Sequence, residues 1–237
     1  MSLTSEQVHL FRHNGFLKLK DRLREDRSEK LRKAIWRNIH EEVEPAVRDP
    51  EGRIIRLSGV VSREPVFLET ATCPLVLDPL ESLLGPNIEL IKNRHNHATL
   101  RLASEDRPER MHRDVRQWSR TIATVIFYLE ETTVENGCTL VVPGSHHFPG
   151  VDGRLYDEAW ALDLLDQALP VPMPEGGMLV IDSMIMHGVG QNRTDGTRMS
   201  MTMGYHSVDE ISDMVNPHRM LVRGERPYDG NVPRTQG

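Results

Sequence analysis

The segment Met111-His112-Arg113-Asp114 carries the strongest chemical signal in the sequence. Residues i and i+2 of a β-strand point to the same face, so an extended segment here would direct one imidazole and one carboxylate toward a common point. Far downstream, the run from Met178 to Gly190 has the pattern of a strand that ends at His187, and this strand could return alongside the first. We therefore predict that His112, Asp114 and His187 bind one metal ion.

A site with two histidines and one carboxylate does not identify its metal. It leaves coordination positions open, as a ferrous ion needs for a bidentate 2-oxo acid and for O₂, but a zinc hydrolase accepts the same ligands. Arg198 favours iron, because it begins a strand whose alternation places Arg198, Ser200 and Thr202 on one face. Its guanidinium group is a planar fork that matches a carboxylate, so Arg198 next to a hydroxyl group suits a buried dicarboxylate.

The first third of the chain has helical patterns. Thr4 and Gln7 have the spacing of a capping box, which begins a helix that Asn14-Gly15 ends. A second helical pattern runs from about Ser28 to Val43, and a third covers Leu75 to Leu84. Together they define a helical N-terminal part that we expect to end at about residue 87.

From about residue 88 to residue 206 the pattern changes to short apolar or alternating runs, which is typical of an antiparallel β-domain. Asn136-Gly137 is a tight-turn signal that joins two of these runs. Helices followed by strands predict a mainly β protein, a jelly roll or barrel with the N-terminal helices packed on one face. The expected strands are Glu89–Lys92, His97–Leu102, Thr121–Leu129, Thr139–Val142, Met178–Ile181 and Arg198–His206.

Bulk composition narrows the class of protein. The 237 residues, 38% of them hydrophobic, fit one domain that spans the chain, with a loose polar tail over about residues 226–237. A formal charge of -6 argues against nucleic acid as a partner. No stretch approaches the ~18 apolar residues of a membrane span, and neither end carries a targeting signal. We expect a cytoplasmic protein that does not bind membranes, with Cys73 and Cys138 as free thiols.

Three groups of residues together resemble one known family. They are His112-Arg113-Asp114, the segment from Glu135 to His146, and His187-Gly188 followed by Arg198. In these pieces, between about residues 88 and 206, the sequence resembles the phytanoyl-CoA dioxygenase family, with weaker agreement from Phe11 to Leu19. The resemblance implies a double-stranded β-helix, which is a cupin-like jelly roll. It also implies an oxygenase that uses Fe(II), 2-oxoglutarate and O₂ and releases succinate and CO₂.

The resemblance implies roles for single residues as well. His112, Asp114 and His187 would bind the iron, and Arg198, with Ser200 beside it, would hold the distal carboxylate of 2-oxoglutarate. The segment Arg94-His95-Asn96 resembles a strand that touches the co-substrate in the bacterial ectoine-hydroxylase branch, so Asn96 is expected to contact 2-oxoglutarate. Trp118 resembles a tryptophan that lines the substrate pocket in that branch.

The expected substrate is a small metabolite, such as a natural-product intermediate. The sequence lacks the Lys-Pro pair and the peroxisomal targeting of the enzyme that names the family, which argues against phytanoyl-CoA. Halogenases of the superfamily replace the ligand carboxylate with a small residue, so Asp114 favours hydroxylation. A cluster of arginines between Arg94 and Arg120 is either a solvated rim or a feature that attracts a carboxylate or phosphate on the substrate. The oligomeric state is left open.

Several nearby side chains have two interpretations. His95 and His97 could compete as metal ligands or line the pocket as hydrogen-bonding groups. Asp182 could be a metal ligand or could orient a loop or a neighbouring imidazole, and we expect the second role. After the turn at Pro143-Gly144-Ser145, the two histidines His146 and His147 are expected to be exposed. A methionine row on the Arg198 strand is expected in the core, and it consists of Met199, Met201 and Met203.

Two alternatives to a 2-oxoglutarate oxygenase remain at this point. One is a cupin-like metalloenzyme, hydrolase or dioxygenase, that does not use 2-oxoglutarate and would leave Arg198 without its expected role. The other is a non-catalytic member of the fold that binds a metabolite. Its expected mark is a damaged metal site, whereas all three ligand positions are intact here.

Overall fold

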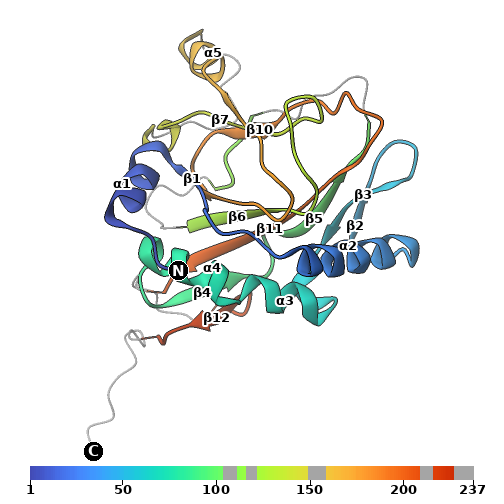
Figure 1. Ribbon diagram of the computed structural model, residues 1–237, viewed down its shortest axis with the longest axis horizontal. Helices are drawn as coiled ribbons and strands as arrows, with labels where there is room; N and C mark the ends of the chain where they lie inside the picture. The colour runs from blue at the N-terminus through green and yellow to red at the C-terminus, as the bar shows by residue number, and fades with distance from the viewer. Residues whose placement is uncertain (104–110, 116–121, 149–158, 209–215, 227–237) are drawn as a thin grey trace, which may run out of the picture.

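Two antiparallel β-sheets of unequal size form the centre of the computed structural model, which describes residues 1–103, 111–115, 122–148, 159–208 and 216–226 (Figure 1). Helices α2, α3 and α4 lie on one side of the larger sheet, and the smaller sheet lies on the other side. The prediction of a mainly β protein with N-terminal helices packed on one face is therefore confirmed.

The N-terminal helices follow their local sequence signals. Helix α1 (Ser5–Asn14) begins at the predicted capping box, in which the Gln7 N–H donates to Thr4 Oγ1 at 3.3 Å and the Thr4 N–H donates to Gln7 Oε1 at 2.9 Å. Gly15 ends the helix in the left-handed conformation. Helices α2 (Glu25–His40) and α4 (Pro74–Leu84) lie close to the predicted spans, whereas α3 (Pro65–Ala71) was not predicted.

The larger sheet has the strand order β1-β9-β6-β11-β5-β3-β2, with β4 paired to β11 and β12 paired to β4. All of these pairs are antiparallel. The strands are β1 (Phe16–Lys18), β2 (Ala46–Arg48), β3 (Ile54–Ser58), β4 (Ile88–Ile91), β5 (Asn96–Arg101), β6 (Ile122–Tyr128), β9 (Met178–Asp182), β11 (Arg198–Ser207) and β12 (Arg219–Arg223).

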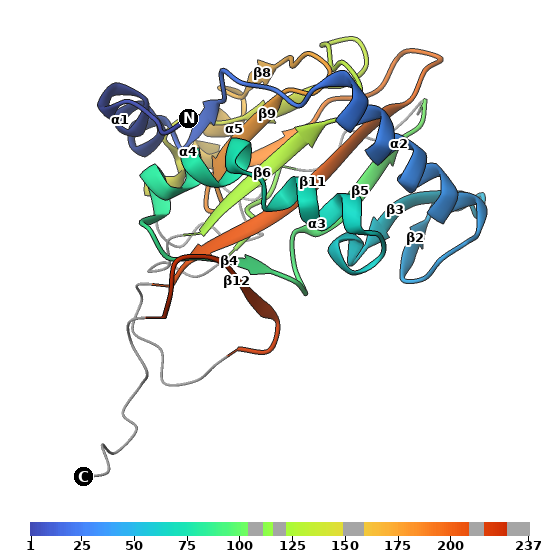
Figure 2. The same ribbon diagram turned by 60° about the horizontal axis from the view of Figure 1, so that its bottom comes forward.

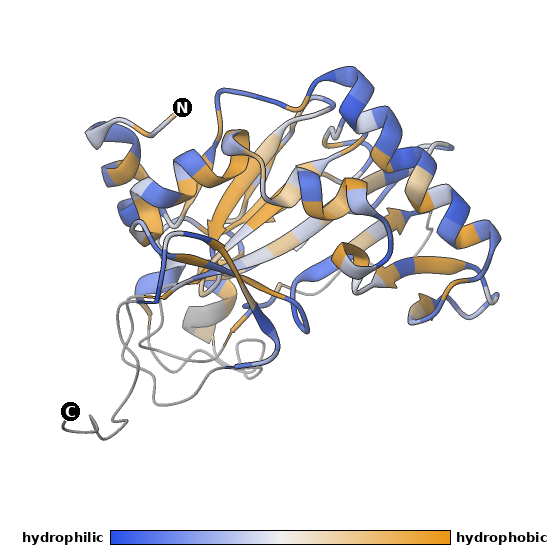
Figure 3. Cartoon of the chain, turned by 90° about the horizontal axis from the view of Figure 1, so that it is seen from below, coloured by the Kyte–Doolittle hydropathy of each residue, from blue (hydrophilic) through white to orange (hydrophobic). Residues whose placement is uncertain are grey.

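The central strand β11 separates the core from the opposite face of the sheet. Met199, Met201 and Met203 are fully buried in the hydrophobic cluster that also contains the helix residues Leu31 and Leu80, as predicted for this row. Burial of each methionine side chain stabilises the fold by about 1.5 to 3 kcal/mol. Figures 2 and 3 show α2, α3 and α4 lying across the apolar strands on this side. None of the described helices is both long and apolar enough to cross a membrane.

The smaller sheet, in the order β10-β7-β8, closes the other side of the molecule. A second apolar cluster joins the two sheets, because Ile126 and Tyr128 of the larger sheet pack with Val141 and Val171 of the smaller one. Its strands are β7 (Thr139–Val141), β8 (Leu169–Val171) and β10 (His187–Val189), and the short helix α5 (Ala159–Leu165) precedes β8.

Two predicted connections differ from the structure. Asn136-Gly137 does not form a hairpin between paired strands, because β6 belongs to the larger sheet and β7 to the smaller one. The run from Met178 to Gly190 is likewise two strands, since β9 ends at Asp182 and β10 begins at His187. A turn between them carries the chain from one sheet to the other, so His187 begins a strand instead of ending one.

Candidate metal centre

One β-bridge, and not a strand, holds the segment that carries His112 and Asp114. The His112 N–H donates to the His187 carbonyl at 2.8 Å, and the His187 N–H donates back to the His112 carbonyl at 3.0 Å. The extended segment expected around His112 is therefore limited to one paired residue. The single bridge nevertheless places the two histidines side by side, with imidazole centroids 4.5 Å apart.

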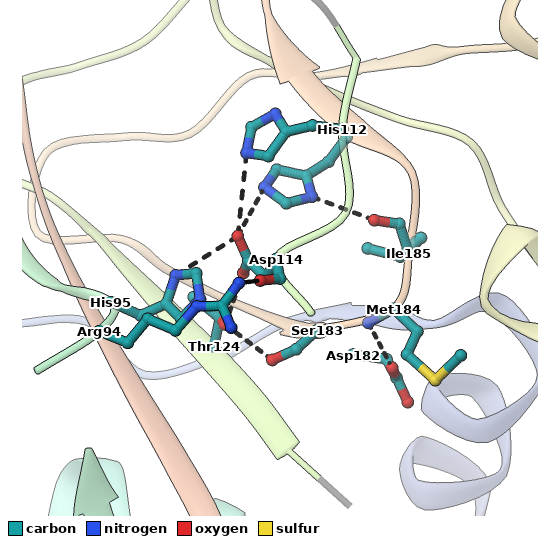
Figure 4. A network of polar contacts seen from close by, with 10 residues as sticks. Arg94, His95, His112, Asp114, Thr124, Asp182, Ser183, Met184 and Ile185 are labelled. Carbon is teal, nitrogen blue, oxygen red and sulfur yellow. Dashed lines mark hydrogen bonds and ion pairs between the residues drawn. The ribbon is translucent and has the colours of Figure 1, made fainter. Parts of the chain in front are cut away.

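The side chains of His112, Asp114 and His187 converge on one point. Their ligand atoms all lie within 4.8 Å of one another. Asp114 Oδ1 is 3.9 Å from His112 Nε2 and 3.6 Å from His187 Nε2, and Figure 4 shows His112 directed at this carboxylate. Two imidazole nitrogens and one carboxylate oxygen are ligands that ferrous iron accepts with further positions open. The three side chains therefore fit one shared ion.

The three side chains differ in their exposure to solvent. Asp114 is 5% exposed and His187 is 8% exposed, whereas the side chain of His112 is 46% exposed. His112 is therefore the most solvent-accessible of the three side chains.

Hydrogen bonds fix the orientation of the Asp114 carboxylate. The Thr124 hydroxyl donates to Asp114 Oδ2 at 2.7 Å and lies 2.9 Å from the Ser183 hydroxyl, so Oδ1 is the oxygen that faces the imidazoles (Figure 4). Burial raises the pKa of Asp114, but attraction to His187 and His95 and the Thr124 hydrogen bond lower it by more. The pKa of this carboxyl therefore lies below its ordinary value, and the group is an anion at neutral pH.

The turn before His187 determines which imidazole nitrogen faces the site. His187 Nδ1 lies 3.1 Å from the Ile185 carbonyl, which fits Nδ1 as the donor and leaves Nε2 as the atom directed at Asp114. Asp182 orients this turn, as expected, because its Oδ1 accepts the Met184 N–H at 2.8 Å. The contact of His187 Nδ1 with the Ile185 carbonyl is of a kind that is common for a metal-binding histidine.

His95 contacts the site from a different segment. Its Nδ1 lies 3.4 Å from Asp114 Oδ1, and its backbone has a positive φ of 46°. The described cluster of possible ligands contains three residues and not His95, so the contact favours the interpretation of His95 as a hydrogen-bonding residue. Burial, followed by the charge of Arg56, lowers the pKa of nearby His97 to about 3, and His97 is therefore neutral.

Arg198 and Ser200 lie where the alternation of β11 predicts. Both side chains are buried on the face opposite the methionine row, and Arg198 is 3% exposed. The Arg198 Nη1 donates to the Gly137 carbonyl at 2.7 Å. This bond ties the guanidinium group to the crossover between the two sheets, so its orientation is fixed within the space that the sheets enclose.

Comparison with known proteins agrees with this geometry. The pattern of the family described as phytanoyl-CoA dioxygenase (PhyH) matches residues 11–200 of the chain. The chain belongs to the phytanoyl-CoA dioxygenase family. It is accordingly a dioxygenase of the class that depends on iron and 2-oxoglutarate, and the expected enzyme class and cofactors are confirmed.

Individual relatives are distant in sequence and close in fold. The peroxisomal phytanoyl-CoA dioxygenase of Mus musculus is 23% identical over 234 residues, which cover 87% of this chain and 69% of the relative. The crystal structure of EctD from S. alaskensis with 2-oxoglutarate and 5-hydroxyectoine has a TM-score of 0.74 at 21% identity, covering 87% of this chain and 77% of that chain. The epimerase SnoN from nogalamycin biosynthesis has a TM-score of 0.76 at 18% identity, covering 92% of this chain and 98% of that chain. The predicted cupin-like jelly roll is thus confirmed.

Two further residues were expected at the site from the family resemblance. Asn96 pairs with Met203 and lies on the helix-covered face of the sheet. Its amide accepts the Val61 N–H at 3.0 Å and donates to the Lys92 carbonyl at 2.8 Å. Trp118 lies outside the described residues, as do Arg107, Arg110, Arg116 and Arg120 of the arginine cluster.

Other residues of the site were not singled out from the sequence. Thr124 is a hydroxyl residue within the otherwise apolar strand β6, and this break in the pattern was a usable signal. Ser183 follows β9 directly and carries no comparable signal. Of the two histidines after the turn, His147 is exposed as expected, whereas His146 is half-buried with Nε2 3.0 Å from the Arg12 carbonyl.

Proposed function

We propose that His112, Asp114 and His187 hold a ferrous ion, that Arg198 and Ser200 bind the distal carboxylate of 2-oxoglutarate, and that the enzyme hydroxylates a small metabolite. The observation that carries this proposal is the convergence of the three ligand atoms within 4.8 Å, between the two sheets that also enclose Arg198. When bound, ferrous iron supplies the oxidative chemistry by which 2-oxoglutarate and O₂ become succinate and CO₂ while the substrate is oxidised.

The protein residues hold and orient the reactants. His187 Nε2 and Asp114 Oδ1 are fixed by the Ile185 carbonyl and the Thr124 hydroxyl, so little reorganisation is needed when a metal binds. A buried guanidinium group gives a charge-assisted bond to a carboxylate, worth about 1.5 to 3 kcal/mol. The exposed side of His112 leaves room for a substrate to approach, and an intact Asp114 supports hydroxylation.

A natural-product intermediate is the substrate class that we favour. SnoN, whose fold this chain shares, comes from nogalamycin biosynthesis, and a structure of SnoN contains iron, α-ketoglutarate and nogalamycin RO. An anionic group on the substrate has less support, because two members of the arginine cluster hold backbone carbonyls. Arg94 donates to the Asp114 carbonyl, and Arg113 donates to those of Ser145 and Phe148.

Anaerobic titration with Fe(II) and 2-oxoglutarate tests the proposal without a known substrate. A weak visible charge-transfer band should appear in the wild type and be absent in His112→Ala and Asp114→Ala. His9→Ala, at an exposed histidine of α1, should retain the band. Absence of the band in the wild type at saturating ligand would favour the alternative of a metalloenzyme that does not use 2-oxoglutarate.

Turnover gives the second measurement. The two site variants should also lose succinate formation, both uncoupled and with any metabolite that stimulates the wild type. Full retention of succinate formation in either variant would refute the assignment of the ligands. Mass spectrometry of reactions with candidate metabolites would then identify the oxidised product.

A further inference from the structure

The side chain and carbonyl of Ser145 connect the two chain segments that carry the metal-binding residues. Ser145 lies in the turn after β7 and is fully buried. Its hydroxyl oxygen accepts the backbone N–H of Met186 at 2.8 Å, directly before His187. Its carbonyl oxygen accepts the guanidinium Nη2 of Arg113 at 2.5 Å, directly between His112 and Asp114. One residue therefore contacts both segments, each time beside a ligand.

Neighbouring contacts make this connection rigid. The Arg113 Nη2 also donates to the Phe148 carbonyl at 2.7 Å, so it holds both ends of the short turn. The Val142 N–H donates to the Met186 carbonyl at 2.9 Å, which fixes Met186 from its other side. Without Arg113 and Ser145, the backbone would link the two segments through the bridge from His112 to His187 and through the Val115 N–H, which donates to the Ser183 carbonyl at 3.1 Å.

The Met186 N–H is buried, so it depends on the Ser145 hydroxyl as its hydrogen-bond acceptor. Met186 is 1% exposed, so water cannot replace a missing acceptor. A buried donor that loses its acceptor carries an energetic penalty, and the backbone relieves this penalty by moving. Movement at Met186 also moves His187, because the two residues share a peptide bond.

We infer that Ser145 and Arg113 are positioning residues that set the spacing of the three metal-binding side chains. This inference rests on the proposed metal site. In the absence of Ser145 or Arg113, the imidazole of His187 and the His112-Asp114 pair would no longer be held at matching positions. Outer contacts that orient metal ligands typically change metal affinity by about 10- to 100-fold when they are removed.

Equilibrium binding of Co(II) alone, followed by its visible absorption, tests this inference apart from enzyme activity. Ser145→Ala and Arg113→Met should bind Co(II) about 10- to 100-fold more weakly than the wild type, with an altered absorption spectrum. Thr132→Ala is the matched control for Ser145→Ala, because Thr132 is also a buried hydroxyl residue that accepts a backbone N–H, that of Met173 at 3.1 Å. It should lower the melting temperature and leave Co(II) affinity unchanged. Arg193→Met, at an exposed arginine, is the control for Arg113→Met.

The outcomes separate this inference from the proposed metal site. His112→Ala should abolish tight Co(II) binding, and if it does not, the metal site itself is wrong. If His112→Ala abolishes binding while Ser145→Ala and Arg113→Met bind Co(II) as the wild type does, only the positioning role is overturned. Equal loss of affinity in Thr132→Ala would also overturn it, because the effect would then be general destabilisation. Should Ser145→Ala not fold, the half-buried Arg113 decides the question alone.

Discussion

Replacement of Arg198 by Lys isolates the contact that we assign to the distal carboxylate of 2-oxoglutarate. The side chain is 3% exposed and bound to the Gly137 carbonyl at 2.7 Å, so its fork is oriented before any ligand binds. Lys keeps the positive charge but cannot hold a carbonyl and a carboxylate in the same fixed plane. Loss of one charge-assisted hydrogen bond, about 1.5 to 3 kcal/mol, would weaken 2-oxoglutarate binding by about 10- to 150-fold.

The assay compares two ligands in the wild type and in two variants. Anaerobic titration of the Fe(II) protein gives the dissociation constant of 2-oxoglutarate and that of pyruvate, a 2-oxo acid without the distal carboxylate. Arg198→Lys should lose affinity for 2-oxoglutarate and keep the affinity of the wild type for pyruvate, and Arg193→Lys should change neither. The reasoning is refuted if Arg198→Lys binds 2-oxoglutarate normally, or if its affinity for both ligands falls equally.

Four further predictions concern metal binding and stability. Thr124→Val removes the donor to Asp114 and should weaken Co(II) binding by about 10- to 100-fold; unchanged affinity contradicts the orienting role. Gly137→Ala should lower the melting temperature, because Gly137 has a φ of +78° and a Cβ there would lie 2.3 Å from the Gly190 carbonyl oxygen. His97 has a pKa of about 3 when folded, so the unfolded chain binds more protons between about pH 3 and 6.5, and the free energy of unfolding rises with pH over this interval. In His97→Asn, urea unfolding at pH 5 and 7.5 should show a smaller rise. When the free metal concentration is 100 times the dissociation constant, removal of the metal by a chelator should lower the free energy of unfolding by about 2.7 kcal/mol. This loss should be measurable as a fall in melting temperature.

The parts of the fold that could be predicted are those that local patterns decide. The capping box of α1 depends on contacts between residues three positions apart, and the prediction agrees with the structure. The alternation along β11 separated Arg198 and Ser200 from the methionine row for the same reason, since a long strand has one parity throughout. Both features are readable because no distant partner is needed to define them.

The features that could not be predicted depend on distant partners. Strand β1 has three residues, too few for a period to be visible, and it forms through pairing with β9 far along the chain. The contact of Asn96 with 2-oxoglutarate was expected from the family resemblance and not from a pattern, and the pairing of β5 with β11 puts Asn96 opposite Met203. The sequence around His187 shows apolar residues on both sides of the turn, so the change from one sheet to the other was not visible in the pattern.

The metal centre lies where three separately supported segments meet. The larger sheet supplies Thr124, and the smaller sheet supplies His187. The segment of His112 and Asp114 belongs to neither sheet, and it is held by hydrogen bonds and by the apolar packing of Met111 and Val115 at its ends. Because apolar packing also fixes the sheets against each other, the hydrogen bonds beside the ligands set the fine geometry of the site. Substitutions in the methionine row should therefore affect stability first, whereas loss of a single hydroxyl beside the ligands should affect metal binding first.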